Sequence, residues 1–298
     1  MQQARCREVP LPSGHAPYAL TLDSGGAVWA TVLHPPALVS VDPGAALAGD
    51  GAGVTVHPLA AGAGRPMQLT AGGDGSLWYT RDDDRLVRRD ATGTERVIEL
   101  PPGAAPYGVC VAPDGTVWFT APGVDRIGRL TPAGDLRMVR LPVPDSRPAM
   151  IAATADGAVW VALNAAGALA RLHDGDTGLV RLPHGPSPAA PVGLAAAGDG
   201  VFYADIAGAR VGHVTAGGTV EQTVFPDAAC RPHAVAADPG GGCWVTLWGS
   251  GELAGVRAGG TVSHHRLPGR EPHGLLVTAG HVWVAMESGS LIAVDRAG

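Results

Sequence analysis

Three side chains near the C-terminal end of the chain could together bind a metal ion and move a proton. Glu271 and His273 are two residues apart, so on an extended backbone both lie on one side, and Glu287 follows fourteen positions after His273. Carboxylate oxygens suit Mg²⁺, which keeps several waters and often takes only one or two protein carboxylates. A neutral histidine beside such an ion can accept a proton while the cation stabilises the developing negative charge. These residues are therefore candidates for metal-assisted acid–base chemistry.

The candidates belong to an internal repeat. Each repeat has a proline, a short apolar stretch, a Gly/Asp turn, and an aromatic residue eleven or twelve positions after the proline. The prolines are Pro17, Pro66, Pro106, Pro148, Pro191, Pro232 and Pro272. The paired aromatic residues are Trp29, Trp78, Trp118, Trp160, Tyr203, Trp244 and Trp283. Successive prolines are 49, 40, 42, 43, 41 and 40 residues apart, which is the period of a four-stranded propeller blade.

Short strands separated by turns fill each repeat. In the third repeat, residues 107–112 and 116–120 read as strands around a Pro-Asp-Gly turn, and residues 126–130 and 138–141 supply two more. No stretch keeps a 3.6-residue apolar period, so we expect little helix. The sequence predicts an all-β fold: one seven-bladed β-propeller domain over residues 1–298, with four strands in each blade.

The seventh repeat lacks a fourth strand. Residues 291–294 form its third strand, and the printed sequence then ends at Gly298. Residues 7–12 resemble the fourth strands at 180–183 and 265–268. We predict that the N-terminal strand becomes the outer strand of blade seven, because this closes the ring and protects an otherwise unpaired edge.

Side chains capable of chemistry gather in repeats six, seven and one. The residue after each proline opens the innermost strand of its blade, and these positions include Tyr18, His233 and His273. The loop four residues past each aromatic returns to the same end of the blade, and it carries Trp248 and Glu287. We expect all five to converge at one mouth of the central channel. For Trp248, stacking on a ligand and ordinary loop packing remain equally open.

Composition narrows the class of protein. The net charge of −6 and the absence of a Lys/Arg cluster argue against a general nucleic-acid binder. No apolar run approaches the ~20 residues of a membrane helix, and residues 1–5 lead directly into the closing strand without a visible signal peptide. We expect a cytoplasmic protein without a membrane partner. The four cysteines lack metal-finger or CxxC spacing and are expected to be reduced thiols.

The segments that carry the candidate residues resemble the active-site segments of virginiamycin B lyases, also called streptogramin B lyases. The resemblance lies in residues 231–233 (RPH), 271–274 (EPHG) and 282–287 (VWVAME), and in total length and the offsets between these segments. It extends over essentially all seven repeats. The spaced His, Glu-x-His and Glu set is much more specific than the proline-led repeats.

The resemblance implies a monomeric carbon–oxygen lyase of antibiotic resistance. Such enzymes inactivate type B streptogramins, which are cyclic depsipeptides, by opening the ring at its ester through Mg²⁺-dependent elimination. By this likeness Glu271 and Glu287 hold the metal, and His273 accepts the proton. The residues that would contact or line the substrate are His233, Tyr18 and Trp248.

Two other functions stay open at the level of sequence. A metal-dependent lactone or ester hydrolase would be expected to draw carboxylates from several blades, whereas the acidic rim residues here are mostly confined to the seventh repeat. A non-catalytic ligand-binding propeller is the second alternative, because a fold does not determine a function. A binding propeller would not explain why Glu271, His273 and Glu287 occur together. Elimination needs no nucleophilic Ser or Cys, and no Gly-x-Ser-x-Gly motif is present.

Overall fold

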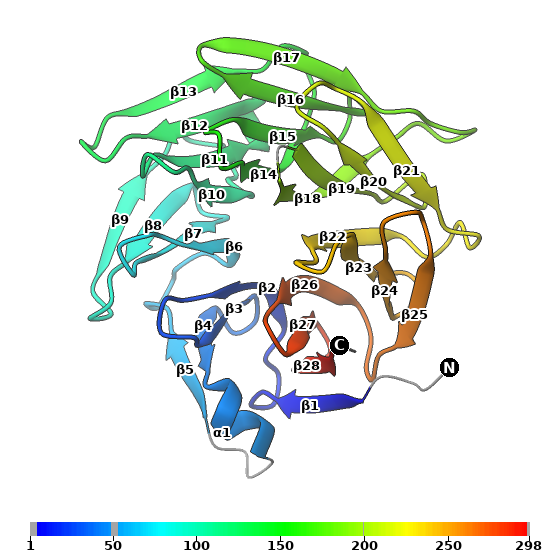
Figure 1. Ribbon diagram of the computed structural model, residues 1–298. Coiled ribbons are helices and arrows are strands. Elements are labelled where there is room, and N and C mark those ends of the chain that lie inside the picture. The colour runs from blue at the N-terminus through cyan, green and yellow to red at the C-terminus, as the bar shows by residue number, and fades with distance from the viewer. Residues whose placement is uncertain (1–4, 49–52, 199, 297–298) are drawn as a thin grey trace.

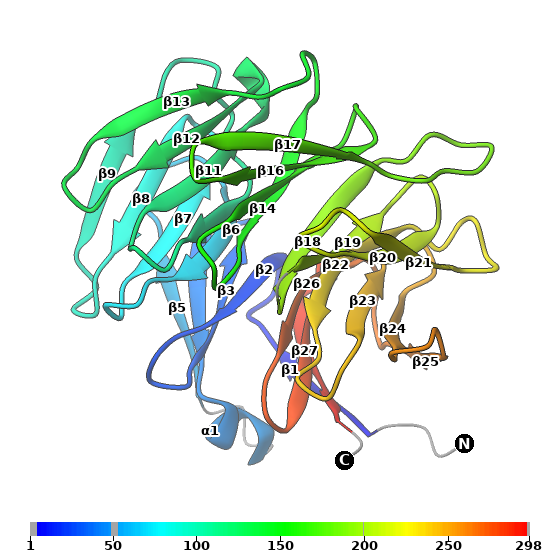
Figure 2. The same cartoon turned by 45° about the horizontal axis from the view of Figure 1, so that its top comes forward.

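Seven antiparallel sheets of four strands each stand as blades around a central axis (Figure 1). The structure is a computed structural model and describes residues 5–48, 53–198 and 200–296. In each blade the first strand is the innermost, and first strands of neighbouring blades contact one another around the axis. Figure 2 shows the strands of blade two following one another outward from β6 to β9. The predicted seven-bladed propeller is therefore confirmed.

The strands have the following bounds. Blades one to three contain β2 (Pro17–Leu22), β3 (Val28–Val32), β4 (Ala37–Val41), β5 (Val54–Pro58), β6 (Pro66–Ala71), β7 (Leu77–Arg81), β8 (Arg85–Arg89), β9 (Glu95–Glu99), β10 (Val109–Val111), β11 (Val117–Ala121), β12 (Arg126–Leu130) and β13 (Leu136–Arg140). Blades four to six contain β14 (Pro148–Ala153), β15 (Val159–Leu163), β16 (Ala168–His173), β17 (Asp176–Arg181), β18 (Pro191–Ala197), β19 (Gly200–Asp205), β20 (Arg210–Val214), β21 (Val220–Val224), β22 (Pro232–Ala237), β23 (Cys243–Leu247), β24 (Glu252–Val256) and β25 (Val262–Arg266). Blade seven contains β26 (Pro272–Val277), β27 (His281–Met286), β28 (Ser290–Asp295) and β1 (Cys6–Pro10).

Polarity along the chain follows the place of each strand in its blade. The second strand lies between two strands of its own sheet and between neighbouring blades, so β15 is apolar and buried at all five positions. The fourth strand faces solvent, and β9 is charged and mostly exposed. Each repeat therefore buries its middle and solvates its outer edge, which is why the aromatic and β-branched residues cluster in the second strand.

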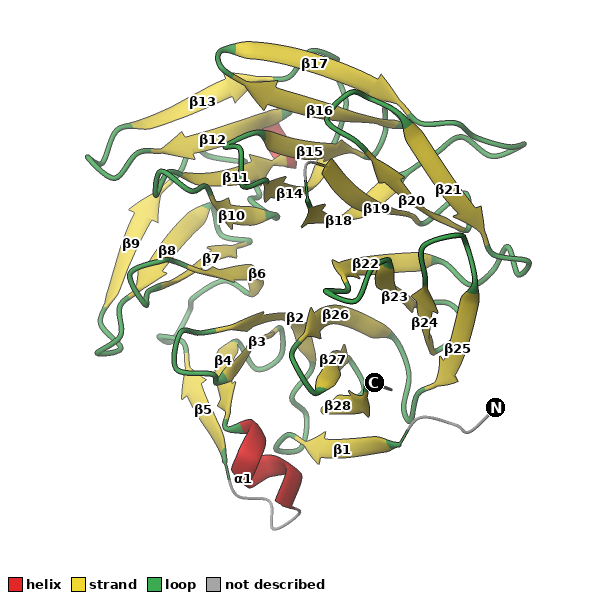
Figure 3. Cartoon of the chain, in the orientation of Figure 1, coloured by secondary structure: helices red, strands yellow, loops and turns green. Residues whose placement is uncertain are grey.

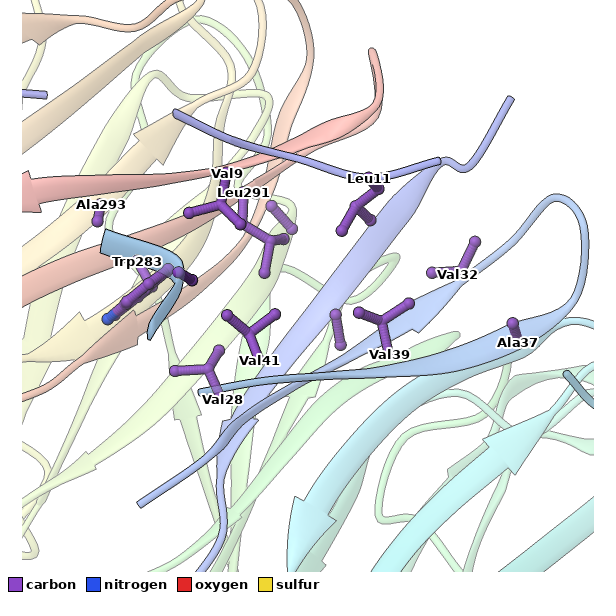
Figure 4. Close-up of a cluster of buried hydrophobic side chains, with 13 residues drawn as sticks. Val9, Leu11, Val28, Val32, Ala37, Val39, Val41, Trp283, Leu291 and Ala293 are labelled. Carbon is purple, nitrogen blue, oxygen red and sulfur yellow. The ribbon is translucent and has the colours of Figure 1, made fainter. Parts of the chain in front are cut away.

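The N-terminal strand completes blade seven, as predicted. β1 pairs antiparallel with β28, with Cys6 opposite Val294 and Pro10 opposite Ser290. Val9 is only 3% exposed and packs with Leu11 in one apolar cluster that draws on blades seven and one. Figure 4 shows Val9 beside Leu291 of blade seven, and Leu11 nearer to Val32 and Val39 of blade one. The strand thus joins the first and last blades through backbone pairing and through apolar burial.

Removing residues 1–12 is expected to lower the midpoint of thermal unfolding strongly. The deletion exposes the edge of β28 and removes two buried apolar side chains, each worth about 1.5–3 kcal/mol of burial. Val9→Ala should reproduce part of the loss, whereas Glu8→Ala, on the exposed side of the same strand, should change the midpoint little. Differential scanning calorimetry measures all three, and an unchanged melting curve for the deletion would contradict this closure.

Helix is minor, also as predicted (Figure 3). Among the described residues, one six-residue helix, α1 (Pro43–Ala48), lies between β4 and β5, and one 3-10 turn, η1 (Pro122–Val124), follows β11. The α1 segment lies in the connection that makes the first proline spacing longer than the others. No helix in the described ranges is both long and apolar enough to cross a membrane.

Two local expectations were wrong. The first strand of blade three was expected over 107–112, but β10 covers only Val109–Val111. In blade five, Phe202 and not Tyr203 is the counterpart of the repeat tryptophan. Phe202 faces Ala195 as Trp118 faces Cys110 in blade three, so Tyr203 lies one residue after the true repeat position.

Candidate active site

A cavity of about 220 Å³ lies on the axis among the innermost strands. Its polar and large lining side chains come from blades on all sides of the ring. They are Tyr18, Gln68, Tyr107, Met150, His233 and His273. Three of the six predicted site residues therefore line this cavity or its edge, and the other three surround it as described below.

His273 and Glu287 form a direct pair at this cavity. His273 Nε2 lies 2.8 Å from Glu287 Oε2, and the histidine is only 8% exposed. An ionised carboxylate can only accept hydrogen bonds, so Nε2–H is the donor and Nδ1 carries the lone pair. Among the described residues Nδ1 has no hydrogen-bond partner, although it is buried. The arrangement is that of a general base held in one tautomer by a carboxylate.

The fold fixes His273 from the neighbouring blade. The pairing of β26 with β27 shifts register between Pro272 and Leu275, so His273 lies in a bulge that turns its side chain out of the regular ladder. The buried Thr246 of blade six donates its hydroxyl to the backbone carbonyl of His273 at 3.1 Å. The same hydroxyl accepts a hydrogen bond from the backbone of Ala234 at 2.9 Å. Blade six therefore holds the base in blade seven.

Glu271 and Glu287 meet through their backbones. The Glu287 N–H donates to the Glu271 carbonyl at 3.2 Å, so the two residues close the same end of blade seven. Glu271 has a φ of 58°, in the left-handed region that non-glycine residues adopt at a cost. Arg231, at the same position of blade six, has a φ of 51°. This turn before the proline places the side chain of residue 271 at the rim rather than in the ladder.

His233 and Tyr18 pack against His273. The ring centroids of His233 and His273 are 4.7 Å apart, and those of Tyr18 and His273 are 4.6 Å apart. Gly274 permits this approach of blades seven and one, because a Cβ there would lie 2.4 Å from the Tyr18 carbonyl oxygen. The Trp248 ring centroid lies 6.2 Å from that of His273. The structure thus brings together all four predicted ring-bearing residues of blades six, seven and one.

Burial keeps both histidines neutral. It lowers the pKa of His233 to about 3, helped by the neighbouring His273. Burial also lowers the pKa of His273, while the hydrogen bond and charge of Glu287 and the charge of Glu271 oppose that change. Burial and the nearby Tyr107 raise the pKa of Tyr18 well above its usual value, so it remains a phenol. Near pH 7 the site therefore offers an unprotonated imidazole base and a neutral hydroxyl.

His233 should make the protein less stable in acid. Its folded pKa near 3 lies below the unfolded value of about 6.5, so only the unfolded state binds the proton between these values. Neutral His233 therefore makes its whole contribution to the free energy of unfolding above about pH 6.5. As the pH falls toward 3 the free energy of unfolding decreases, by on the order of a few kcal/mol. Urea unfolding of His233→Asn at pH 7 and pH 4.5 should show a smaller difference between the two pH values than the parent protein. The exposed His184→Asn is the control, and equal pH dependence in all three proteins would contradict the assignment.

The carboxylates at this mouth fit a Mg²⁺ ion. Glu287 uses Oε2 toward His273, which leaves Oε1 available, and Glu271 is exposed at the rim. Mg²⁺ needs only one or two carboxylates because water completes its octahedral shell. Within the described ranges, no group of three or more His, Cys, Asp or Glu side chains is arranged to hold a metal ion. A Mg²⁺ ion at this mouth would therefore have to take most of its ligands from water.

Sequence reasoning assigned no role to Tyr107 and Gln68. The Tyr107 hydroxyl of blade three lies 2.8 Å from that of Tyr18 in blade one, and Gln68 donates to Tyr107 at 3.4 Å. Together they bridge the channel beside His273. The available signal was positional, since Tyr107 follows its proline just as Tyr18, His233 and His273 follow theirs.

Known proteins are similar to this chain in sequence and in fold. The profile of the Virginiamycin B lyase family matches residues 4–294. A virginiamycin B lyase of Nocardia farcinica is 36% identical over 281 residues, which is 93% of this chain and 95% of that protein. The crystal structure of selenomethionine-substituted virginiamycin B lyase from Staphylococcus aureus has a TM-score of 0.90 and 28% identity, covering 98% of this chain and 99% of that one. A catalytically inactive variant of the Staphylococcus aureus enzyme, solved with quinupristin, gives a TM-score of 0.89 and 27% identity with the same coverage. The chain belongs to the virginiamycin B lyase family of lyases.

Proposed function

We propose that this enzyme inactivates type B streptogramins by opening their ring at the ester through Mg²⁺-dependent elimination. The observation that carries the proposal is the His273–Glu287 pair beside the axial cavity, in a member of a lyase family. His273 Nδ1 is buried and has no hydrogen-bond partner among the described residues. The structure of the inactive Staphylococcus aureus relative with quinupristin supports a streptogramin as the substrate.

The reaction needs one base at one carbon atom. His273 Nδ1 takes the proton from the α-carbon of the threonine unit, and the C–H electron pair becomes the double bond between the α- and β-carbons. The bond from the β-carbon to the ester oxygen breaks, and its electrons leave with the carboxylate. Protonated His273 is stabilised by the Glu287 carboxylate on Nε2. The proton then passes to water and restores the base.

Glu271 and Glu287 are the residues that would hold Mg²⁺. When bound, the ion supplies positive charge at the carbonyl oxygen next to the ionising carbon and stabilises the enolate-like charge that develops there. Glu287 would serve both the ion and His273 through its two oxygens. This shared role explains why the base and the acidic pair lie in one blade.

The aromatic and imidazole side chains around the base would hold the ring. His233 lies 4.7 Å from His273 between ring centroids and is neutral, so it can hydrogen-bond a substrate carbonyl or amide without carrying charge. Tyr18 and Trp248 lie close to the same imidazole and would supply aromatic contacts to the ring. Positioning of the α-proton by these groups would contribute to the rate along with the base.

Mass spectrometry of quinupristin incubated with the enzyme tests the proposal. Elimination leaves the mass of the opened product unchanged, whereas hydrolysis adds one water. Repeating the reaction in ¹⁸O-labelled water separates these outcomes further, since hydrolysis places solvent oxygen in the product. A gain of one water with ¹⁸O incorporation would establish the hydrolase alternative, and an intact ring after long incubation would favour the non-catalytic binder.

We further propose that the enzyme acts as a monomer in the cytoplasm. A net charge of −6 supports a small-molecule substrate rather than nucleic acid. Light scattering coupled to size-exclusion chromatography tests the monomer, and cell fractionation tests the location.

A further inference from the structure

A second pocket, of about 490 Å³, lies directly outside the active-site mouth between blades six and seven. Trp248 and Glu271, both at the mouth, form part of its wall. Three arginines complete the wall, and they are Arg231, Arg266 and Arg270. The pocket therefore begins where the proposed catalytic site ends.

Its arginines are not matched by protein carboxylates. In the part of the chain that the structure describes, none of the three guanidinium groups forms an ion pair, and all three residues are exposed. Arg231 lies over the Trp248 ring, with Cζ 5.4 Å from its centroid. Glu252 lies opposite Arg266 in the backbone register of β24 and β25. Its carboxylate, however, contacts the side chains of Ser250 and His264. Against Glu271 alone, three guanidiniums leave a surplus of two positive charges.

We propose that this arginine pocket binds the carboxylate released when the depsipeptide ring opens. The inference rests on the proposed function, because opening of the ester by either elimination or hydrolysis creates one new carboxylate. Arginine recognises a carboxylate through two parallel N–H···O bonds, which are charge-assisted and stronger than neutral ones. A residue stacked on Trp248 keeps its guanidinium edge free for such bonds. The pocket would thus favour departure of the leaving group and hold the opened product.

Isothermal titration calorimetry with ring-opened quinupristin tests this binding apart from turnover. The probe is prepared by mild alkaline opening of the ester, so its supply does not depend on the enzyme. Arg231→Gln and Arg270→Gln should each raise its Kd about tenfold or more, and added salt should weaken binding to the parent protein. The methyl ester of the same probe, which lacks the charge, should bind the parent protein and both variants equally weakly.

Arg147→Gln is the matched control, because Arg147 occupies the position of Arg231 in blade four, shares its left-handed φ of 47° and lies outside the pocket. Its Kd for the probe should equal that of the parent protein. Unchanged affinity in the Arg231 and Arg270 variants, or equal affinity of the parent for acid and ester, would overturn the inference while leaving ring opening intact. An enzyme that leaves intact quinupristin unopened would instead refute the proposed function, whatever the calorimetry shows.

Discussion

His273→Ala is expected to lower kcat for ring opening by about 10²–10⁴-fold, the usual contribution of a positioned general base. The imidazole is buried, its lowered pKa leaves it unprotonated near pH 7, and Glu287 holds its Nε2, so the substitution removes the base to which we assign the α-proton. The fold should survive, because the backbone of residue 273 is held through its carbonyl by Thr246 rather than through its side chain. Single-turnover cleavage, followed by mass spectrometry, measures the loss.

Three controls separate a chemical defect from a structural one. His213→Ala removes a histidine of blade five that packs at a tilt against Phe202, outside the site, and should keep full activity. Added imidazole should restore part of the rate of His273→Ala, since it can occupy the vacated space and accept the proton. Substrate deuterated at the threonine α-carbon should show a primary isotope effect with the parent enzyme. A His273→Ala variant with near-parental kcat would remove this residue from the chemical step.

Removing divalent metal should abolish turnover, and added Mg²⁺ should restore it. Glu271→Gln is expected to raise the Mg²⁺ concentration needed for half-maximal activity by at least about tenfold, because an amide is a weaker ligand than a carboxylate. Glu287→Gln should lower activity more than Glu271→Gln does, because it also weakens the hydrogen bond that orients His273. Initial rates measured against Mg²⁺ concentration after chelation check both variants.

The matched control is Glu221→Gln, a glutamate of blade five that lies outside the mouth. Its metal dependence should equal that of the parent enzyme. Mg²⁺ binding to the protein without substrate, measured by calorimetry, provides a second readout that does not rely on activity. Full activity of the parent enzyme in excess chelator would eliminate the metal from the reaction.

Sequence alone determined the architecture, because the contacts that build a blade are local. Each four-stranded sheet is made by neighbouring segments joined through short turns, so the spacing of prolines and turn residues already counts the blades. Closure by residues 7–12 was also predictable, since a blade with three strands leaves an edge that another segment must cover. Tyr18, His233 and His273 could be found for the same reason, as equivalent positions of a repeat must lie at one end of a ring.

Tertiary structure alone decided how those residues interact. The 2.8 Å pair of His273 and Glu287 depends on a bulge in β26, and no sequence pattern reported the resulting tautomer. The contact between Tyr18 and Tyr107 joins residues 89 positions apart across the channel. The gathering of three arginines between blades six and seven joins residues from separate loops and strands, which only the folded chain brings together. Periodicity specifies which residues are equivalent, but hydrogen bonds and charge balance depend on side-chain positions within a few tenths of an ångström, and only the closed ring sets those.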